Sequence, residues 1–152
     1  MTTNKVFGIV AKELGFNGSG MTRFIEYPTY YLLINHQKSA YSKSFYLNVG
    51  ILYKELLSQN LGGEDIAGAF KARDPSAPIH VDFRIERCPT MPVDLAASME
   101  CCVTEERMAD LKEILCDALQ RLMAFMEKNH DRKTIRKLSD AKQLSAMLLK
   151  EV

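Results

Sequence analysis

Polar and aromatic side chains alternate with apolar ones in two segments near the middle of the chain, residues 45–51 and 79–86. Successive side chains of an extended strand point to opposite faces, so each segment predicts a strand with one apolar side and one polar side. Tyrosines, amides and an arginine stand on the polar side, and such groups form hydrogen bonds with many kinds of partner. We therefore expect this side of the sheet to accept a protein partner or a small polar ligand.

A third segment, residues 29–37, adds to the polar side if its register brings it alongside the other two. Within it, Tyr30–Ile34 is apolar on both parities. This run indicates a central strand with partial cover on each side, supplied by this chain or by a partner. The binding residues predicted on the three segments are Tyr31, Asn35, Gln37, Tyr46, Asn48, His80, Asp82 and Arg84. The alternative is an ordinary solvated sheet face held by cross-strand pairs.

The four cysteines and three histidines raise the question of metal binding or catalysis. Cys101 and Cys102 could meet Cys88 and His80 if a short helix folds back, but the spacing fits no zinc motif. Cys88 with His80 could serve as nucleophile and base, but no orienting group or oxyanion donor accompanies the pair. We therefore expect thiols that pack in the core, and we predict no catalytic residue, no metal site and no cofactor.

Two further features suggest phosphate or nucleic acid at first sight. The glycine-rich residues 15–20 follow a helix and precede a strand, the reverse of the order in a phosphate-binding loop, so we expect a turn there and also at Gly62-Gly63. Residues 128–137 carry five basic side chains and one aspartate, but no interleaved aromatic ring. We do not expect nucleic acid as a partner.

The composition fits one folded domain, with 152 residues, 47% hydrophobic residues and a net charge of +1. A chain of this length buries most of its surface without disulfides or metals. Its balanced charges produce no overall field toward nucleic acid or anionic lipid, and no stretch approaches the ~18 uncharged apolar residues of a membrane span. Two adjacent cysteines and no Cys-x-x-Cys pair favour a reducing cytoplasm, so we expect a cytoplasmic protein with no membrane partner.

These residues are positioned by elements that the same patterns predict. Residues 6–14 have apolar side chains at helical spacing and precede Gly15, which indicates a helix. The expected strands are residues 21–27, 29–37, 45–51 and 79–86, and further helices are expected at 64–71, 94–102, 104–128 with Thr104 as N-cap, and from 139 onward. The predicted fold is a single α+β domain over residues 1–152: a four-stranded, mostly antiparallel meander with an N-terminal helix and C-terminal helices packed on one face.

Four stretches also carry a family resemblance. Leu14-Gly15-Phe16 ends the first helix, Arg23-Phe24 lies in the next strand, and Asn35–Ser39 and Phe45–Gly50 follow in that order. With these motifs the chain resembles the bacterial family described as domain of unknown function 4304, well over residues 6–52 and weakly over 81–85. No activity, cofactor or catalytic residue is established for that family. The resemblance therefore implies an α+β fold in the bacterial cytosol and no reaction.

We accordingly expect a non-enzymatic cytosolic protein that binds another protein through the polar side of the sheet, by analogy of fold with immunity proteins that neutralise toxins. A second copy of the chain, paired along an uncovered strand edge, is another candidate partner. The alternative function is a small-ligand-binding protein or an enzyme with a pocket between the sheet and the loop of residues 58–78.

Overall fold

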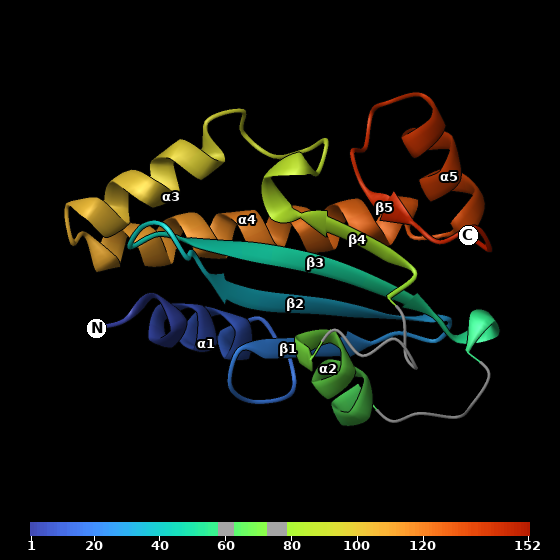
Figure 1. Ribbon diagram of the computed structural model, residues 1–152, viewed down its shortest axis with the longest axis horizontal. Helices are drawn as coiled ribbons and strands as arrows, with labels where there is room; N and C mark the ends of the chain where they lie inside the picture. The colour runs from blue at the N-terminus through green and yellow to red at the C-terminus, as the bar shows by residue number, and fades with distance from the viewer. Residues whose placement is uncertain (58–62, 73–78) are drawn as a thin grey trace.

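The computed structural model describes residues 1–57, 63–72 and 79–152 (Figure 1). Five strands form one sheet in the order β1-β2-β3-β4-β5, and every neighbouring pair is antiparallel. The strands are β1 (Thr22–Glu26), β2 (Tyr30–Lys38), β3 (Phe45–Tyr53), β4 (Val81–Arg84) and β5 (Met147–Leu148). The predicted α+β fold and meander are confirmed, with β5 as a fifth, two-residue strand beside β4.

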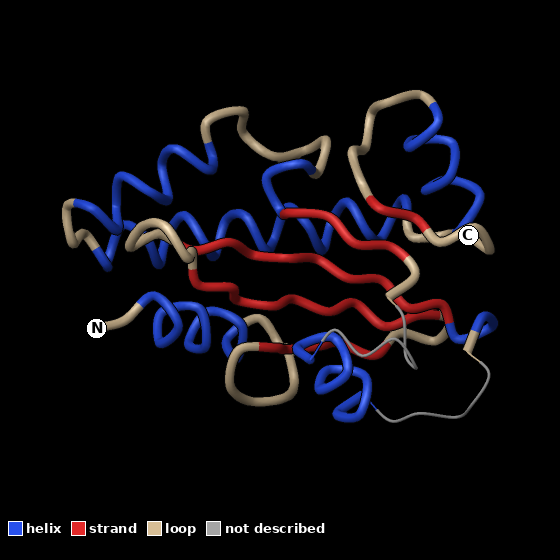
Figure 2. Tube along the Cα trace, in the orientation of Figure 1, coloured by secondary structure: helices blue, strands red, loops and turns tan. Residues whose placement is uncertain are grey.

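The helices are α1 (Thr3–Glu13), α2 (Gly63–Ala72), α3 (Leu95–Thr104), α4 (Met108–Asn129) and α5 (Arg132–Asp140), with short 3-10 turns at Lys54–Leu56 and Ile85–Arg87. Four of them, α1, α3, α4 and α5, supply buried side chains to one core with the first face of the sheet. Figure 2 shows α4 running along the sheet on the side opposite α2. No helix in the described part of the chain is long and apolar enough to cross a membrane.

The first face carries the apolar side chains that the alternation predicts. Val49 lies opposite Phe83 and Ile51 opposite Val81, and all four are buried in the main core. The predicted strand at 79–86 is too long, because Ile85 already belongs to a 3-10 turn. Ile85 is nevertheless fully buried, so its predicted place in the core is confirmed.

Local hydrogen bonds explain where α1 begins and ends. The Thr2 hydroxyl accepts from the Lys5 backbone N–H and caps the first turn. At the other end, Gly15 has a φ of 92°, and the N–H groups of Gly15 and Phe16 donate to the carbonyls of Lys12 and Ala11. This is the Schellman arrangement, which a glycine accommodates without strain. The predicted turn after the first helix is confirmed.

The junction of α3 and α4 differs from the prediction. Thr104 is the last residue of α3 and not the N-cap of the long helix, which begins at Met108. The backbone turns at Glu106, whose φ is 56°, and the N–H of Arg107 donates to the carbonyl of Cys102. This is again a Schellman turn, but no glycine in the sequence marks it.

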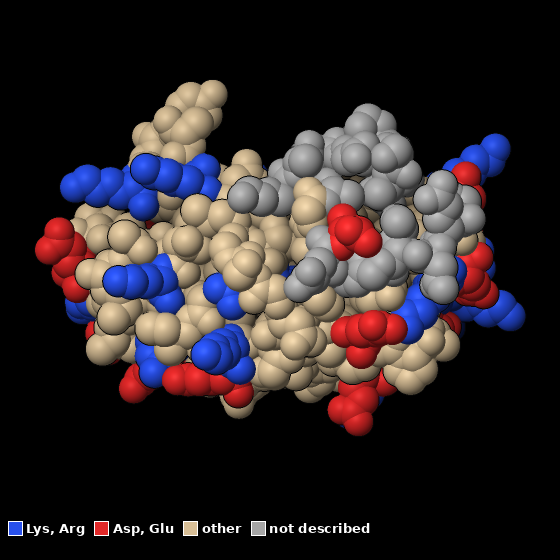
Figure 3. All heavy atoms as spheres, turned by 90° about the horizontal axis from the view of Figure 1, so that it is seen from below, with Lys and Arg blue, Asp and Glu red and all other residues tan. Residues whose placement is uncertain are grey.

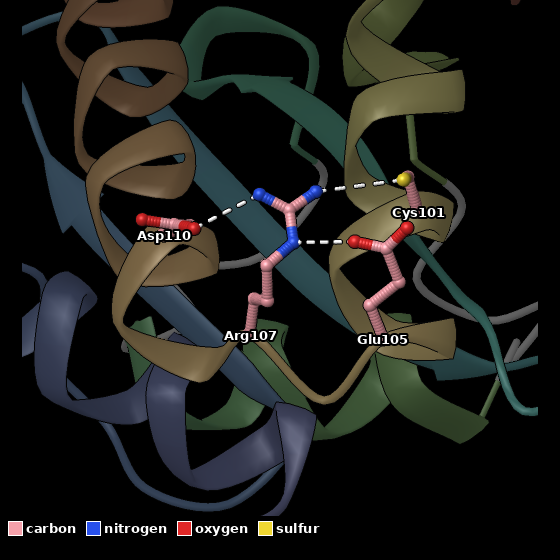
Figure 4. Close-up of polar contacts among 4 residues, drawn as sticks. All are labelled: Cys101, Glu105, Arg107 and Asp110. Atoms are coloured by element: carbon pink, nitrogen blue, oxygen red, sulfur yellow. Dashed lines mark hydrogen bonds and ion pairs between the residues drawn. The ribbon is translucent and has the colours of Figure 1, made fainter.

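Arg107 stabilises this junction through its side chain (Figure 4). Its guanidinium contacts the carboxylates of Glu105 at 2.7 Å and Asp110 at 2.9 Å, and it donates to the Cys101 sulfur at 3.5 Å. These contacts raise the pKa of the guanidinium, with the Cys101 and Asp110 hydrogen bonds as the largest causes. All the groups are exposed, so the cluster orients the turn and contributes little free energy.

The C-terminal segment also folds differently from the prediction. The last helix begins at Arg132 and not near residue 139, with the Asp131 carboxylate accepting from the Thr134 N–H as its N-cap. The basic side chains of residues 128–137 therefore lie on α5 and the last turn of α4. Leu144 enters the core and Met147 belongs to β5, so the expected helical stripe of apolar residues does not form.

Gly50 allows α2 to approach the second face of the sheet. A Cβ atom at Gly50 would lie 3.1 Å from atoms of both Ile79 and Phe70. We predict that Gly50→Ala lowers the free energy of unfolding by about 1–3 kcal/mol, because packed neighbours must shift. Gly68→Ala, in the same helix with open space around it, should raise stability by up to about 1 kcal/mol. Urea unfolding of both variants checks this, and equal effects would show that α2 does not pack on Gly50.

Candidate functional site

The second face of the sheet has two halves. Over one half, α2 packs on the strands and forms a separate apolar cluster. Its buried members are Phe24, Tyr31, Leu33, Leu52, Ile66, Ala67 and Phe70. The other half carries the polar side chains of β2, β3 and β4 together with groups from the segment around β5. We call this half the polar face; it consists of Asn35, Gln37, Tyr46, Asn48, Asp82, Arg84, Arg87, Ser145 and Met147.

Within the polar face, a chain of hydrogen-bonded amide side chains connects the strands. Asn48 lies directly opposite Asn35, and its Nδ2 donates to Asn35 Oδ1 at 3.2 Å and to Gln37 Oε1 at 2.8 Å. Asn35 Nδ2 in turn donates to Thr22 Oγ1 at 2.9 Å. Asn35 and Asn48 are buried, so these bonds satisfy polar groups that have left water. The amides are thus held in one arrangement.

Arg84 and Tyr46 are the half-buried pair of the same surface. Asn48 pairs with Arg84 in the register, so Tyr46 is a diagonal neighbour of Arg84 across the strands. The guanidinium carbon of Arg84 lies 3.7 Å from the centre of the Tyr46 ring. A guanidinium held by its face against a ring keeps its planar fork of N–H groups for other acceptors.

A cavity of about 460 Å³ opens beside this pair. Its described lining combines side chains from β3, β4, the following 3-10 turn and the approach to β5. These residues are Asn48, Asp82, Phe83, Arg84, Arg87, Ser145, Ala146 and Met147. Arg87 Nη1 donates to Ser145 Oγ at 2.8 Å, which fastens the C-terminal segment to the strand end. The cavity therefore presents two guanidinium groups, one carboxylate and the exposed Met147.

The part of the chain that carries β1–β4 matches a known protein family. The model of the family described as domain of unknown function DUF4304 matches residues 7–90. The chain belongs to this family. The match covers α1 from residue 7 onward, α2 and β1–β4, and so the amide chain of the polar face, but neither α3–α5 nor β5. No curated protein and no solved structure matches the chain.

Six of the eight predicted residues lie together on the polar face, and two lie elsewhere. Tyr31 is on the same side of the sheet but is covered by α2, and Lys54 Nζ lies 5.0 Å from its ring centre. His80 precedes β4, where the alternation of the strand no longer applies, and its buried Nδ1 accepts from the Tyr53 backbone N–H at 2.8 Å. The cover predicted over Tyr30–Ile34 is thus supplied by this chain at Tyr31, whereas the expectation that His80 stands on the polar side of the sheet is wrong.

Sequence reasoning missed three residues of the polar face: Arg87, Ser145 and Met147. Arg87 lies in the 3-10 turn after β4, where the strand pattern has ended. Ser145 and Met147 come from a segment for which a helix was expected. Met147 is 78% exposed in the short strand β5, and no pattern in the sequence marks it as part of this surface.

The thiols do not assemble into a metal site in the described part of the chain, where no three His, Cys, Asp or Glu side chains are grouped for a metal ion. Cys88 and Cys102 are buried and Cys101 is exposed. Burial raises the pKa of the Cys88 thiol, although a hydrogen bond with Thr90 partly opposes this shift. The two buried cysteines belong to the main core, as the sequence predicts.

The amide chain of the polar face yields a stability prediction. Asn48→Ala removes the donor to both Asn35 and Gln37, and we expect the free energy of unfolding to fall by about 1–3 kcal/mol, because a buried acceptor is left without a partner. Gln37→Ala leaves the bond between Asn48 and Asn35 intact and removes an exposed side chain, so its effect should stay within about 0.5 kcal/mol. Urea unfolding measures both, and equal losses would contradict the assigned bonds.

The two buried histidines yield a pH prediction. Burial lowers the pKa of His36 and of His80 below the ordinary value, with nearby Glu151 partly opposing the shift at His80. As the pH falls through about 6.5, the unfolded chain therefore binds protons that the folded chain does not, and stability declines. Urea unfolding between about pH 7.5 and pH 5 should show this decline. His80→Asn keeps an acceptor for Tyr53 and should make the decline shallower; an unchanged slope would exclude His80 as a contributor.

Proposed function

We propose that this protein is a non-enzymatic, cytoplasmic bacterial protein that binds a partner protein through the polar face. The observation that carries the proposal is the prearranged surface of Arg84, Tyr46 and Asn48 beside a cavity of about 460 Å³. Tyrosine and arginine are the residue types that most often dominate the energy of protein interfaces. Analogy of fold with immunity proteins suggests neutralisation of a toxin as the biological role.

The arrangement lowers the cost of binding. Asn48 is fixed by its two bonds to Asn35 and Gln37, and Arg84 is held against Tyr46. Side chains that are already ordered lose less entropy when a partner docks.

The charges and the apolar group on this face indicate which partner fits. Arg84 and Arg87 can each bind a carboxylate through two N–H groups, and Asp82 contributes one negative charge to the same cavity. Met147 is 78% exposed and offers apolar contact next to them. The partner segment that fits best carries an acidic side chain close to an apolar one.

The alternative pocket between the sheet and residues 58–78 has less support. Residues 63–72 form α2, whose Ile66 and Phe70 are fully buried against Leu33 and Leu52. The space between this helix and the sheet is therefore filled by side chains. Residues 58–62 and 73–78 lie outside the described part of the chain. A small polar ligand would instead fit the cavity of the polar face, whose volume is in the usual range for such sites.

The test compares partner capture by matched variants. The native chain is used as bait in a lysate of its source cells, and the captured protein is then titrated against the purified chain. Arg84→Glu with Tyr46→Ala should weaken this binding at least about 10-fold, because it reverses a charge and removes the ring beneath it. Lys133→Glu, an exposed charge reversal on α5, is the control and should bind as the native chain does.

Hydrogen exchange of the purified complex gives an independent reading. The backbone amides of β4, β5 and the 3-10 turn Ile85–Arg87 should become better protected when the partner binds. Equal binding of the partner by the native chain, the Arg84 and Tyr46 double variant and the Lys133 control would reject the polar face as the interface. A metabolite bound in the cavity, with no protein captured, would favour the small-ligand alternative.

A further inference from the structure

A groove of about 780 Å³ lies at the β1 edge of the sheet, between α1 and the glycine-rich turn that follows it. It is separate from the polar face, since the residues lining the two sites do not overlap. Its described lining contains three basic side chains, Lys5, Lys12 and Arg23, and no aspartate or glutamate. Three positive charges therefore gather here in a chain whose net charge is only +1.

The three cations lie in a row along one side of α1. Lys5, Gly8 and Lys12 are spaced by three and four residues, so they share one face of the helix, and the two lysines are ~10 Å apart along its axis. Arg23 fills the position between them. A Cβ atom at Gly8 would lie 2.9 Å from Arg23 Nη2, so the guanidinium rests directly on the helix at the residue without a side chain.

The glycine-rich turn holds Arg23 in this place. Arg23 Nε donates to the carbonyl of Gly20 and Nη1 to that of Gly18, both at 3.3 Å. Both glycines have positive φ values, which residues other than glycine rarely adopt. The turn is thus not a phosphate-binding loop made of N–H groups. Its carbonyl oxygens accept from Arg23, and Nη2 of Arg23 points toward α1.

The surroundings of the groove favour an anionic ligand. A hollow lined by charges of one sign concentrates ions of the opposite sign. Figure 3 looks onto this side of the molecule and shows Lys and Arg side chains over its left half, where α1 lies, with Asp and Glu side chains along the left and lower edges. Asn4 also lines the groove, and its buried Oδ1 has no hydrogen-bond partner among the described residues; as an acceptor it cannot bond to a phosphate oxygen and is left to water.

We propose that this groove binds a soluble small molecule with two or more linked phosphate groups. Arg23 contacts the middle of the ligand, and Lys5 and Lys12 contact its two ends. A single phosphate is too short to reach both lysines, and a simple dicarboxylate brings fewer charges to three uncompensated cations. This inference does not depend on the proposed function, because it uses a different surface and a different chemistry.

Calorimetric titration with inorganic triphosphate tests the proposal on the full chain. The native protein should bind triphosphate more tightly than inorganic phosphate, and added salt should weaken both. The double variant Lys5→Gln with Lys12→Gln should lose at least about 10-fold in affinity for triphosphate. The control is Lys133→Gln with Lys137→Gln, which removes the same charge from exposed positions on α5 and should change affinity less than about twofold.

Gly8→Ala separates the position of Arg23 from overall charge and from folding. The added methyl group would displace the guanidinium, so affinity should fall several-fold, whereas alanine in place of glycine favours the helix and should not lower the melting temperature. Undiminished triphosphate binding by this variant would overturn the assigned role of Arg23.

Three results would overturn the proposal itself. The first is the absence of triphosphate binding to the native chain. The second is an equal loss in the α5 control, which would mean that only net charge matters. The third is Lys5- and Lys12-dependent binding of a short oligothymidylate or of anionic lipid vesicles without binding of triphosphate, which would assign the groove to a nucleic acid or to a membrane surface.

Discussion

The antiparallel pairing of β2 with β3 is the constraint on which the rest of the structure depends. It runs over nine residue pairs, from Tyr30 with Tyr53 to Lys38 with Phe45. Because side chains alternate along each strand, this single register decides which groups meet on each face. It places Leu32 beside Ile51 in the main core and, on the other face, sets two buried asparagines opposite each other. A shift by one residue would expose the core side chains and bury the polar ones.

The division of the second face follows from the same register. Where the side chains of the paired strands are apolar or absent, α2 packs on them, and Gly50 provides the space for Phe70. Where the paired side chains are Asn35 and Asn48, an apolar helix would leave the amides without partners, which costs free energy. The amides instead bond to one another and to Gln37 at the edge of the open surface. The part covered by α2 and the polar face thus occupy adjacent halves of one side of the sheet, separated by a change of polarity along the strands.

Much of this arrangement could be predicted from the sequence, because it depends on alternation within regular strands. The core side of β3 and β4, and the grouping of Tyr46, Asn48 and Arg84 on the other side, follow from a period of two. The errors lie where that period does not apply. His80 falls just before β4 begins, and its side chain turns to Tyr53. The apolar run Tyr30–Ile34 indicates that Tyr31 is covered, but no local pattern shows that the distant helix α2 supplies the cover.

The errors near the C-terminus have a related cause. Glu106 and Lys142 take left-handed backbone conformations without being glycine, so no residue type marks the turns after α3 and α5. The second turn leads the chain back to β4 and delivers Ser145 to Arg87. The cavity of the polar face is therefore built by two parts of the chain: a family domain that supplies the amides and Arg84, and a later segment beyond the family match. Because that later segment forms one wall of the cavity, substitutions in it change the shape and charge of the cavity without touching the bonds of the amide chain.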